Sequence, residues 1–166
     1  MNHVYIILDN AFSGEWCAEQ IARFHESESE EKQIGQDRYA RFDFLDKGLA
    51  KEIYGCLSEN VELLDHYIGH RFYMNHYVAG SSYISPHADG HITDSKGNPS
   101  VRTVLIYLND CSGGDTCIQM YEEKVKVSPR AGRVLLLDQE VIHSGEQPLT
   151  DKYILRTDLF WIKMKP

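Results

Sequence analysis

The chain has 166 residues, of which 42% are hydrophobic and 25% are charged, and its formal net charge is −8. These proportions are those of one soluble globular domain with a substantial core. Residues 1–31 contain seven acidic residues and one basic residue, Arg23. This distribution argues against nonspecific binding to a nucleic-acid backbone, which requires clustered Lys and Arg side chains.

The cysteines and the apolar segments indicate the compartment. The four cysteines are Cys17, Cys56, Cys111 and Cys117. They form neither a Cys-x-x-Cys motif nor a disulfide framework, so free thiols in a reducing compartment are expected. The longest aliphatic run, Val4–Leu8, ends at Asp9, follows no basic segment and is too short to cross a bilayer. The sequence thus predicts a cytoplasmic protein without a membrane segment.

The sequence up to Gly69 predicts one strand followed mainly by helices. Val4–Leu8 is a short apolar run typical of a strand, and Ser13 is a suitable N-cap for the helix that follows. Helical periodicity predicts helices over Gly14–His25, Leu45–Leu57 and Val61–Ile68. Residues 32–43 alternate between apolar and polar and are ambiguous. We expect residues 1–70 to form a helical support for the rest of the chain, and this support could also carry a dimer interface; the oligomeric state stays open.

From residue 71 onward the pattern changes to a period of two, which is typical of strands. Turn residues separate eight such segments. The expected strands are Phe72–Val78, Ser82–His87, Val101–Leu108, Thr116–Glu122, Lys124–Val127, Arg133–Leu137, Val141–His143 and Lys152–Trp161. This succession of short strands favours a mainly β, double-sheet jelly roll over residues 71–166. No repeat or linker marks a second domain, so residues 1–166 are expected to form one domain.

Two histidines and one aspartate form a candidate metal site. His87 and Asp89 are two positions apart, so their side chains point the same way on an extended strand. His143 follows much later in the chain, in a separate predicted strand. Each residue alone is more often an ordinary surface or hydrogen-bonded side chain. Two histidines and a carboxylate on a β scaffold, however, form the facial triad of non-haem Fe(II) oxygenases.

Further motifs surround these three residues in a consistent order. They are Leu8–Cys17 near the start, Asn75-His-Tyr77 and Gly80 before Pro86-His87-Ala-Asp89, then Arg102–Asn109, Gly113-Gly-Asp-Thr116, Pro129 with Gly132, and His143-Ser-Gly followed by Lys152–Asp158. In this order, over nearly the whole chain, they resemble the prolyl 4-hydroxylase-type branch of the 2-oxoglutarate- and Fe(II)-dependent dioxygenases. The resemblance implies a double-stranded β-helix (jelly-roll) core.

The resemblance also implies the cofactors and the roles of matching residues. His87, Asp89 and His143 would bind Fe(II), and 2-oxoglutarate would chelate the metal before O2 reacts; ascorbate is a further cofactor that the resemblance admits. The far carboxylate of 2-oxoglutarate needs a buried cation. Lys152 and Arg156 are equal candidates, and because they lie about 13 Å apart on one strand they cannot both serve.

Two tyrosines and one loop complete the expected site. Tyr107 would donate to the far carboxylate of 2-oxoglutarate, and Tyr77 would line the cosubstrate pocket. The polar segment Gly90–Ser100 is either a mobile flap over the site or only a hairpin connection. His91, two positions after Asp89, is a possible competing ligand that we expect to be a loop residue near the substrate entrance.

The resemblance implies hydroxylation of an unactivated C–H bond, with peptidyl proline as the first substrate to consider. A free amino acid or another small molecule is the alternative within the same chemistry. Two rival classes use the same scaffold without this activity: a noncatalytic jelly-roll binding module, and a cupin-like metal protein or metal-dependent hydrolase. The binding module would be expected to have a broken triad or no cation. A cupin usually has more histidines in a tighter cluster and would not need Tyr107 with Lys152 or Arg156 at the floor of the pocket.

Overall fold

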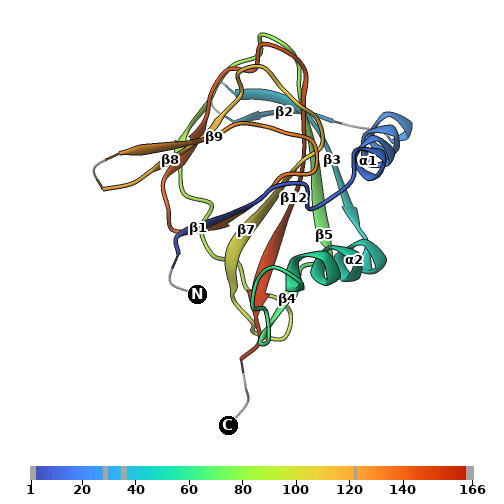
Figure 1. Cartoon of the computed structure of the whole chain (residues 1–166), viewed down its shortest axis with the longest axis vertical. Coiled ribbons are helices and arrows are strands. Elements are labelled where there is room, and N and C mark those ends of the chain that lie inside the picture. Colours follow the sequence, from blue (N-terminus) through green and yellow to red (C-terminus); the bar gives the residue numbers. More distant parts are fainter. Residues whose placement is uncertain (1–2, 28–29, 35–36, 122, 164–166) are drawn as a thin grey trace.

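The computed structural model describes residues 3–27, 30–34, 37–121 and 123–163. This part of the chain forms two antiparallel sheets and two helices, and is mainly β. The elements in chain order are β1 (Tyr5–Leu8), α1 (Gly14–Glu26), β2 (Glu30–Ile34), β3 (Asp37–Leu45), α2 (Lys47–Ser58), β4 (His66–Ile68), β5 (Arg71–Tyr77), β6 (Ile84–His87), β7 (Ser100–Tyr107), β8 (Thr116–Gln119), β9 (Lys124–Val127), β10 (Val134–Asp138), β11 (His143–Gly145) and β12 (Lys152–Trp161). Figure 1 shows both helices on one side of the molecule and the β8–β9 hairpin projecting on the other.

The larger sheet has the order β1-β10-β7-β12-β5-β3-β2, and β4 pairs with the far end of β12. The smaller sheet has the order β6-β11-β8-β9. Strands that are distant in sequence therefore lie side by side, and β12 at the end of the chain takes a central place between β7 and β5.

Both faces of the larger sheet are buried. Successive side chains of a strand point to opposite faces, so one strand contributes side chains to the cores on both sides of the sheet. On β7, Val104 and Ile106 belong to a core cluster that includes the buried residues of the helices. Leu105 and Tyr107 belong to a second cluster, together with Ile118 of the smaller sheet. The first cluster thus fills the layer between helices and sheet, and the second fills the layer between the two sheets.

Capping residues set the starts of both helices. The Ser13 side chain accepts a hydrogen bond from the backbone of Trp16 in α1, and the Asp46 side chain does the same for Leu49 in α2. These bonds satisfy backbone N–H groups that have no partner inside the helix. The predicted helices Gly14–His25 and Leu45–Leu57 are therefore confirmed, with small displacements of their ends.

The predicted helix Val61–Ile68 is wrong. Its C-terminal part forms β4, and the segment before β4 is irregular. The prediction depended on Leu64 and Ile68, whose spacing would place them on one face of a helix. Leu64 is 80% exposed, however, whereas Ile68 is buried. The backbone carbonyl of Leu63 instead accepts a hydrogen bond from the Tyr54 hydroxyl, which ties this segment to α2.

Residues 1–70 are also less helical than expected, because β2 and β3 form a hairpin within them. β3 pairs with β5 and extends the larger sheet. The alternation in this stretch is that of a strand: Phe42 and Phe44 pack against the cluster on the helix side, while Tyr39 belongs to the cluster between the sheets. β3 consequently contributes to the face on which the candidate site lies.

A strand lies at or near each position predicted from residue 71 onward, although most ends are displaced. The predicted strand Val141–His143 shares only His143 with β11, and Glu122, the predicted end of another strand, lies outside the described residues. For β12 the predicted and observed bounds coincide. Within the described residues, no helix is long and apolar enough to cross a membrane.

Candidate active site

Three side chains converge at one edge of the space between the sheets. His87 ends β6 and His143 begins β11, and the two residues are direct partners across the antiparallel pair. Asp89 lies just beyond the end of β6. Its Oδ1 lies 3.6 Å from His87 Nε2, and its Oδ2 lies 3.7 Å from His143 Nε2. Of the described residues, these three form a group whose candidate ligand atoms lie within 4.8 Å of one another.

The backbone fixes the orientation of both imidazole rings. His87 Nδ1 lies 2.9 Å from the carbonyl oxygen of Ser85, and His143 Nδ1 lies 3.0 Å from that of Val141. A carbonyl can only accept, so each Nδ1 carries a proton, and in the neutral ring each Nε2 then has a lone pair available to a metal ion. This arrangement is that of metal-binding histidines, whose second nitrogen commonly donates to a carbonyl or carboxylate.

The Asp89 carboxylate is held as an anion. Thr103 on β7 donates a hydrogen bond to its Oδ2, and Arg156 Nη2 on β12 lies 3.3 Å from its Oδ1. Burial acts to raise the pKa of Asp89, but His87, Arg156, Thr103 and His143 outweigh burial and hold the pKa well below its usual range. The Asp89 carboxylate in turn raises the pKa of His87, whereas burial lowers the pKa of His143.

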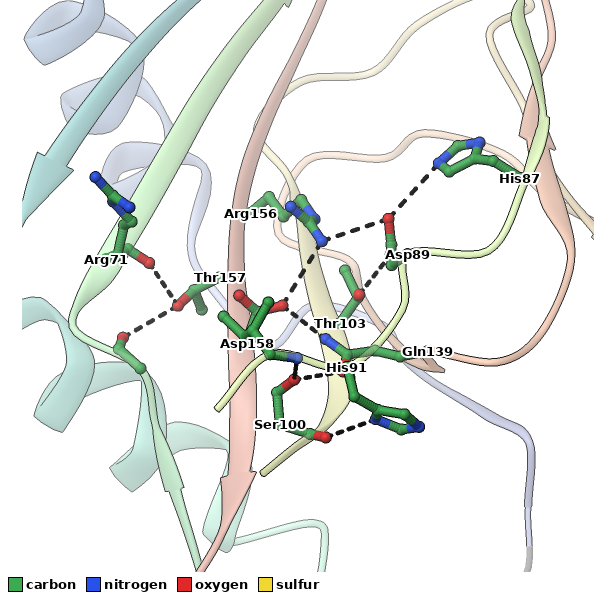
Figure 2. A network of polar contacts seen from close by, with 12 residues as sticks. Arg71, His87, Asp89, His91, Ser100, Thr103, Gln139, Arg156, Thr157 and Asp158 are labelled. Carbon is green, nitrogen blue, oxygen red and sulfur yellow. Dashed lines mark hydrogen bonds and ion pairs between the residues drawn. The ribbon is translucent and has the colours of Figure 1, made fainter. Parts of the chain in front are cut away.

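Arg156 also contacts a network of buried polar side chains. Its Nη2 lies 3.6 Å from Asp158, which accepts a hydrogen bond of 2.8 Å from the Gln139 side chain. Ser100 donates to Gln139 in turn. Figure 2 shows this series of contacts running from His87 through Asp89 and Arg156 to the buried end of the network. Burial raises the pKa of Asp158.

The loop after Asp89 connects β6 of the smaller sheet to β7 of the larger sheet, and within it Thr93 and Pro99 form an isolated antiparallel bridge. His91 Nδ1 lies 2.7 Å from the carbonyl oxygen of Ser100, and its Nε2 lies 3.2 Å from Glu140, so both ring nitrogens are occupied outside the donor group. Asp94 accepts backbone hydrogen bonds within the turn. Residues 90–100, all of them described, are absent from the lining of the cavity that extends from the donor group.

This cavity has a volume of about 460 Å³ and lies between the sheets. It is lined by Tyr39, Arg41, Tyr73, Asn75, Tyr77, Ile84, Ser85, Pro86, His87, Ala88, Asp89, Leu105, Thr116, His143, Ser144, Gly145, Lys152, Ile154 and Arg156. The charged side chains among these are the cations Arg41, Lys152 and Arg156 and the anion Asp89. The cavity therefore contains the expected ligands and both expected cations.

Lys152 is the deeply buried cation of this cavity. The residue is 3% exposed, and its Nζ donates a hydrogen bond to the backbone carbonyl of Gly114. Within the described residues it has no carboxylate at ion-pair distance, and burial lowers its pKa to about 8. Gly114, whose carbonyl accepts this hydrogen bond, has a φ of +67°. This backbone conformation favours glycine.

The two predicted tyrosines differ in their position. Tyr77 lines the cavity, and its ring centroid lies 5.6 Å from Lys152 Nζ. Tyr107 is fully buried outside the cavity lining, and its hydroxyl donates a 2.7 Å hydrogen bond to Thr116, which does line the cavity. In this structure the Tyr107 hydroxyl therefore contacts Thr116, while the Tyr107 ring centroid lies 5.8 Å from Lys152 Nζ.

Two strands contribute polar lining residues to which the sequence assigned no role: Tyr39 and Arg41 on β3, and Tyr73 and Asn75 on β5. Their common signal is the period of two, since Tyr73 and Asn75 precede Tyr77 at every second position. On β5 this alternation indicates which side chains share a face with Tyr77. It could not indicate where β3 lies, because β3 and its partner β5 are separated in the sequence.

The donor set fits a divalent iron ion. Two neutral imidazole nitrogens and one carboxylate are the ligands of the non-haem Fe(II) facial triad, and three protein ligands leave coordination positions open. Both Nε2 atoms lie beside the carboxylate at distances too long for good hydrogen bonds, so the three groups are spaced around a common point.

Comparison with known proteins agrees with this geometry. Residues 72–162, more than half of the chain, match the model of the family described as the 2OG-Fe(II) oxygenase superfamily. No curated protein matches the sequence.

Solved structures with the same fold include several prolyl hydroxylases. A viral collagen prolyl hydroxylase from Paramecium bursaria Chlorella virus-1, solved with 2-oxoglutarate, has a TM-score of 0.68 at 15% identity and 98% coverage of both chains. A Pseudomonas putida prolyl-4-hydroxylase has a TM-score of 0.71 at 16% identity, covering 98% of this chain and 95% of that one. A Trichoplax adhaerens prolyl hydroxylase, in complex with a hypoxia inducible factor peptide fragment, has a TM-score of 0.70 at 18% identity, covering 97% and 84%.

At these identities the structural similarity establishes the fold, and the family model establishes the family. The resemblance inferred from the ordered motifs is thereby confirmed. The chain belongs to the 2OG-Fe(II) oxygenase superfamily, and it is an oxidoreductase whose chemistry uses Fe(II), 2-oxoglutarate and O2.

Proposed function

We propose that the protein hydroxylates an unactivated C–H bond, with His87, Asp89 and His143 as its Fe(II) ligands and Lys152 as the cation for 2-oxoglutarate. The observation that carries the proposal is the pairing, in one cavity, of the three-donor group with a buried lysine that lacks a carboxylate partner among the described residues. The proposal includes a jelly-roll core made by the two sheets, and one domain in which the helices brace the larger sheet.

The contacts of the two cations favour Lys152 over Arg156. Arg156 already lies against two carboxylates, Asp89 and Asp158, so part of its charge is neutralised within the protein. The acceptor of Lys152 is a backbone carbonyl, and a buried charge without a counter-ion is unfavourable. A carboxylate entering this end of the cavity would supply that counter-ion.

The protein residues bind and orient the reactants. When bound, iron and 2-oxoglutarate supply the oxidising chemistry by which O2 is consumed, succinate and CO2 are released, and the substrate gains a hydroxyl group. Arg156 and Thr103 hold the Asp89 carboxylate in its ionised, ligand-competent form. Tyr77 covers one side of Lys152, and Tyr107 fixes the Thr116 hydroxyl near the same end. Enclosure between the sheets limits access of water to the reacting carbon.

The substrate class follows less directly. Prolyl hydroxylases among the structures with this fold make peptidyl proline the first substrate to test, and one of them was solved with a peptide fragment. Hydroxylation of a free amino acid or another small molecule is the second candidate, and the modest cavity of about 460 Å³ favours it.

An anaerobic titration with Fe(II) and then 2-oxoglutarate tests the proposal. Chelation of iron by 2-oxoglutarate should produce a weak visible charge-transfer band. The band should be lost in Asp89→Asn and His143→Ala and should require more 2-oxoglutarate in Lys152→Met. Iron binding without the band would contradict the cosubstrate site, and undiminished iron binding by His143→Ala would contradict the ligand assignment.

A further inference from the structure

We propose that the cavity recognises an amino-acid carboxylate together with the N–H group beside it, through Arg41, Arg156 and Asn75. The inference rests on the proposed function, since it takes Lys152 to be occupied by 2-oxoglutarate. It assigns the substrate class: the oxidised carbon belongs to a free amino acid or to the C-terminal residue of a peptide.

The first argument is charge. The chain as a whole has a formal net charge of −8, yet the cavity is lined by three cations and one carboxylate. The charges of Fe(II) and of the 2-oxoglutarate dianion cancel, so cofactor binding leaves the net charge of this lining unchanged. With Lys152 assigned to the cosubstrate, Arg41 and Arg156 remain. Each is already paired within the protein, Arg41 with Asp43 and Arg156 with Asp89 and Asp158, so they would offer an anionic substrate directed N–H donors rather than unpaired charge.

The second argument is the arrangement of these two arginines around one ring. Arg41 Cζ lies 4.0 Å from the ring centroid of Tyr73, and Arg156 Cζ lies 5.4 Å from the same centroid. β5 carries Tyr73 between β3 and β12, so the two guanidinium groups come from the strands on either side of it. The ring limits where each planar group can lie, and a fixed guanidinium loses less freedom when it binds a carboxylate.

Arg41 retains donors for a ligand. Its Nε and Nη2 lie 2.5 and 3.3 Å from the two oxygens of Asp43, whose side chain is 40% exposed. A guanidinium has five N–H donors, so this pair leaves others available. Because Arg41 lines the cavity without belonging to the three-donor group, it can bind substrate without altering the ligands.

The third argument is an unpaired buried acceptor. Asn75 is 7% exposed and lines the cavity, and among the described residues its Oδ1 has no hydrogen-bond donor. Asn75 is the direct strand partner of Arg41 on one side and of Ile154 on the other. A buried carbonyl without a donor is unfavourable. Because Oδ1 itself is inaccessible in this structure, the side-chain amide would have to rotate before an N–H group of the substrate could satisfy it. A carboxylate partner and an N–H acceptor side by side match the head group of an amino acid.

The size of the cavity agrees with this substrate. Small-molecule sites span about 300 to 1,000 Å³. The 460 Å³ found here is in the lower half of that range and must also hold the cosubstrate. The remaining space suits one residue rather than several.

Matched probe pairs test the inference by equilibrium binding. The probes are free L-amino acids and their carboxamides, and N-acetyl-L-amino acids and their carboxamides, titrated into anaerobic protein loaded with Fe(II) and 2-oxoglutarate. Removing the carboxylate charge should weaken binding by roughly tenfold or more. Preference for the free series identifies a free amino acid, and preference for the acetylated series identifies the C-terminus of a peptide.

Three variants separate the roles. Arg41→Gln should reduce the acid-to-amide preference by about tenfold, while Asn75→Leu should weaken acids and amides alike, because both keep the N–H group. Arg23→Gln is the matched control: Arg23 also stacks on a ring, at 4.0 Å from the Phe44 centroid, and pairs with Asp46, but it lies outside the cavity. It should leave the preference unchanged.

Several results would overturn the inference: no acid binds better than its amide, Arg41→Gln keeps the preference, or Arg23→Gln removes it. The visible band distinguishes these failures from failure of the proposed function. A normal band without an acid preference refutes the substrate class alone. If the band is absent, the proposed function fails, and the same probe pairs titrated into metal-free protein still decide whether Arg41 selects a carboxylate.

Discussion

Replacing Lys152 by Met should stabilise the protein while weakening its cosubstrate binding. Lys152 is buried, and its pKa falls from 10.5 to about 8, which corresponds to about 3 kcal/mol of unfavourable free energy for burying the charged form. Methionine has a similar length and no charge. Its introduction removes the hydrogen bond to the Gly114 carbonyl, a loss of about 1 kcal/mol. The net gain in the free energy of unfolding, the difference of these two terms, should be about 2 kcal/mol at pH 7.

The sign of the pH dependence follows from the lowered pKa. Below pH 8 the lysine is charged in both the folded and the unfolded wild type, so the full penalty applies. Between pH 8 and 10.5 the folded wild type has lost this proton while the unfolded chain still binds it, so wild-type stability rises with pH relative to the variant. The advantage of Lys152→Met should therefore shrink across that window. Urea denaturation of both proteins at pH 7 and pH 9.5 measures it.

The same variant should bind 2-oxoglutarate about ten- to 150-fold more weakly, because a charge-assisted hydrogen bond contributes roughly 1.5–3 kcal/mol. Calorimetric titration with 2-oxoglutarate at fixed Fe(II) measures this loss. Arg156→Met is the comparison, and its effect on cosubstrate affinity should be smaller. If Lys152→Met binds 2-oxoglutarate as tightly as the wild type, the reasoning from its unpaired buried charge is wrong.

Three further substitutions have expected outcomes. His143→Ala removes a ligand atom and should lower Fe(II) affinity more than about 100-fold with an unchanged circular dichroism spectrum, since loss of a supporting outer-shell partner alone costs up to about that factor; near-normal iron binding would exclude it as a ligand. Gly132→Ala should destabilise the fold by more than about 2 kcal/mol in urea, because Gly132 has φ +76° and an added Cβ would lie 2.0 Å from the Phe12 carbonyl oxygen; a change under about 0.5 kcal/mol would show that the turn relaxes. Tyr107→Phe removes the donor to Thr116 and should lower stability by about 1 kcal/mol. The KM for 2-oxoglutarate should change less than about threefold, roughly 0.6 kcal/mol, and a large increase would instead support direct donation by Tyr107.

The local patterns of the sequence predicted much of the fold. β12 was predicted with its observed bounds, because its alternation is regular and turn residues flank it. The helix predicted at Val61–Ile68 failed because periodicity does not reveal which apolar residues face the core, and Leu64 faces solvent. β3 stayed ambiguous because its alternation becomes meaningful only when it pairs with β5, which follows in the chain only after α2 and β4.

The site residues also divide into those that the sequence could identify and those that depend on the three-dimensional arrangement. His87, Asp89 and His143 could be named in advance because their residue types and order carry the pattern of a metal site. The choice between Lys152 and Arg156 could not be made from the sequence, because it depends on which cation already faces Asp89 and Asp158. Arg41 was given no role, and Asn75 appeared only as part of a motif, for a related reason: only the pairing of β3 with β5 brings them to one wall of the cavity.

The donor group also joins the two sheets at the edge of the space between them. His87 ends β6, the edge strand of the smaller sheet, and residues 85–88 are exposed. Asp89 is bonded to Thr103 of the larger sheet, and His143 lies on β11. An ion held by all three would act as a reversible cross-link between the sheets and would stabilise the folded state when bound. Metal-free protein should accordingly be cleaved by proteases around residues 80–90 sooner than loaded protein, and chelators should be kept out of its purification.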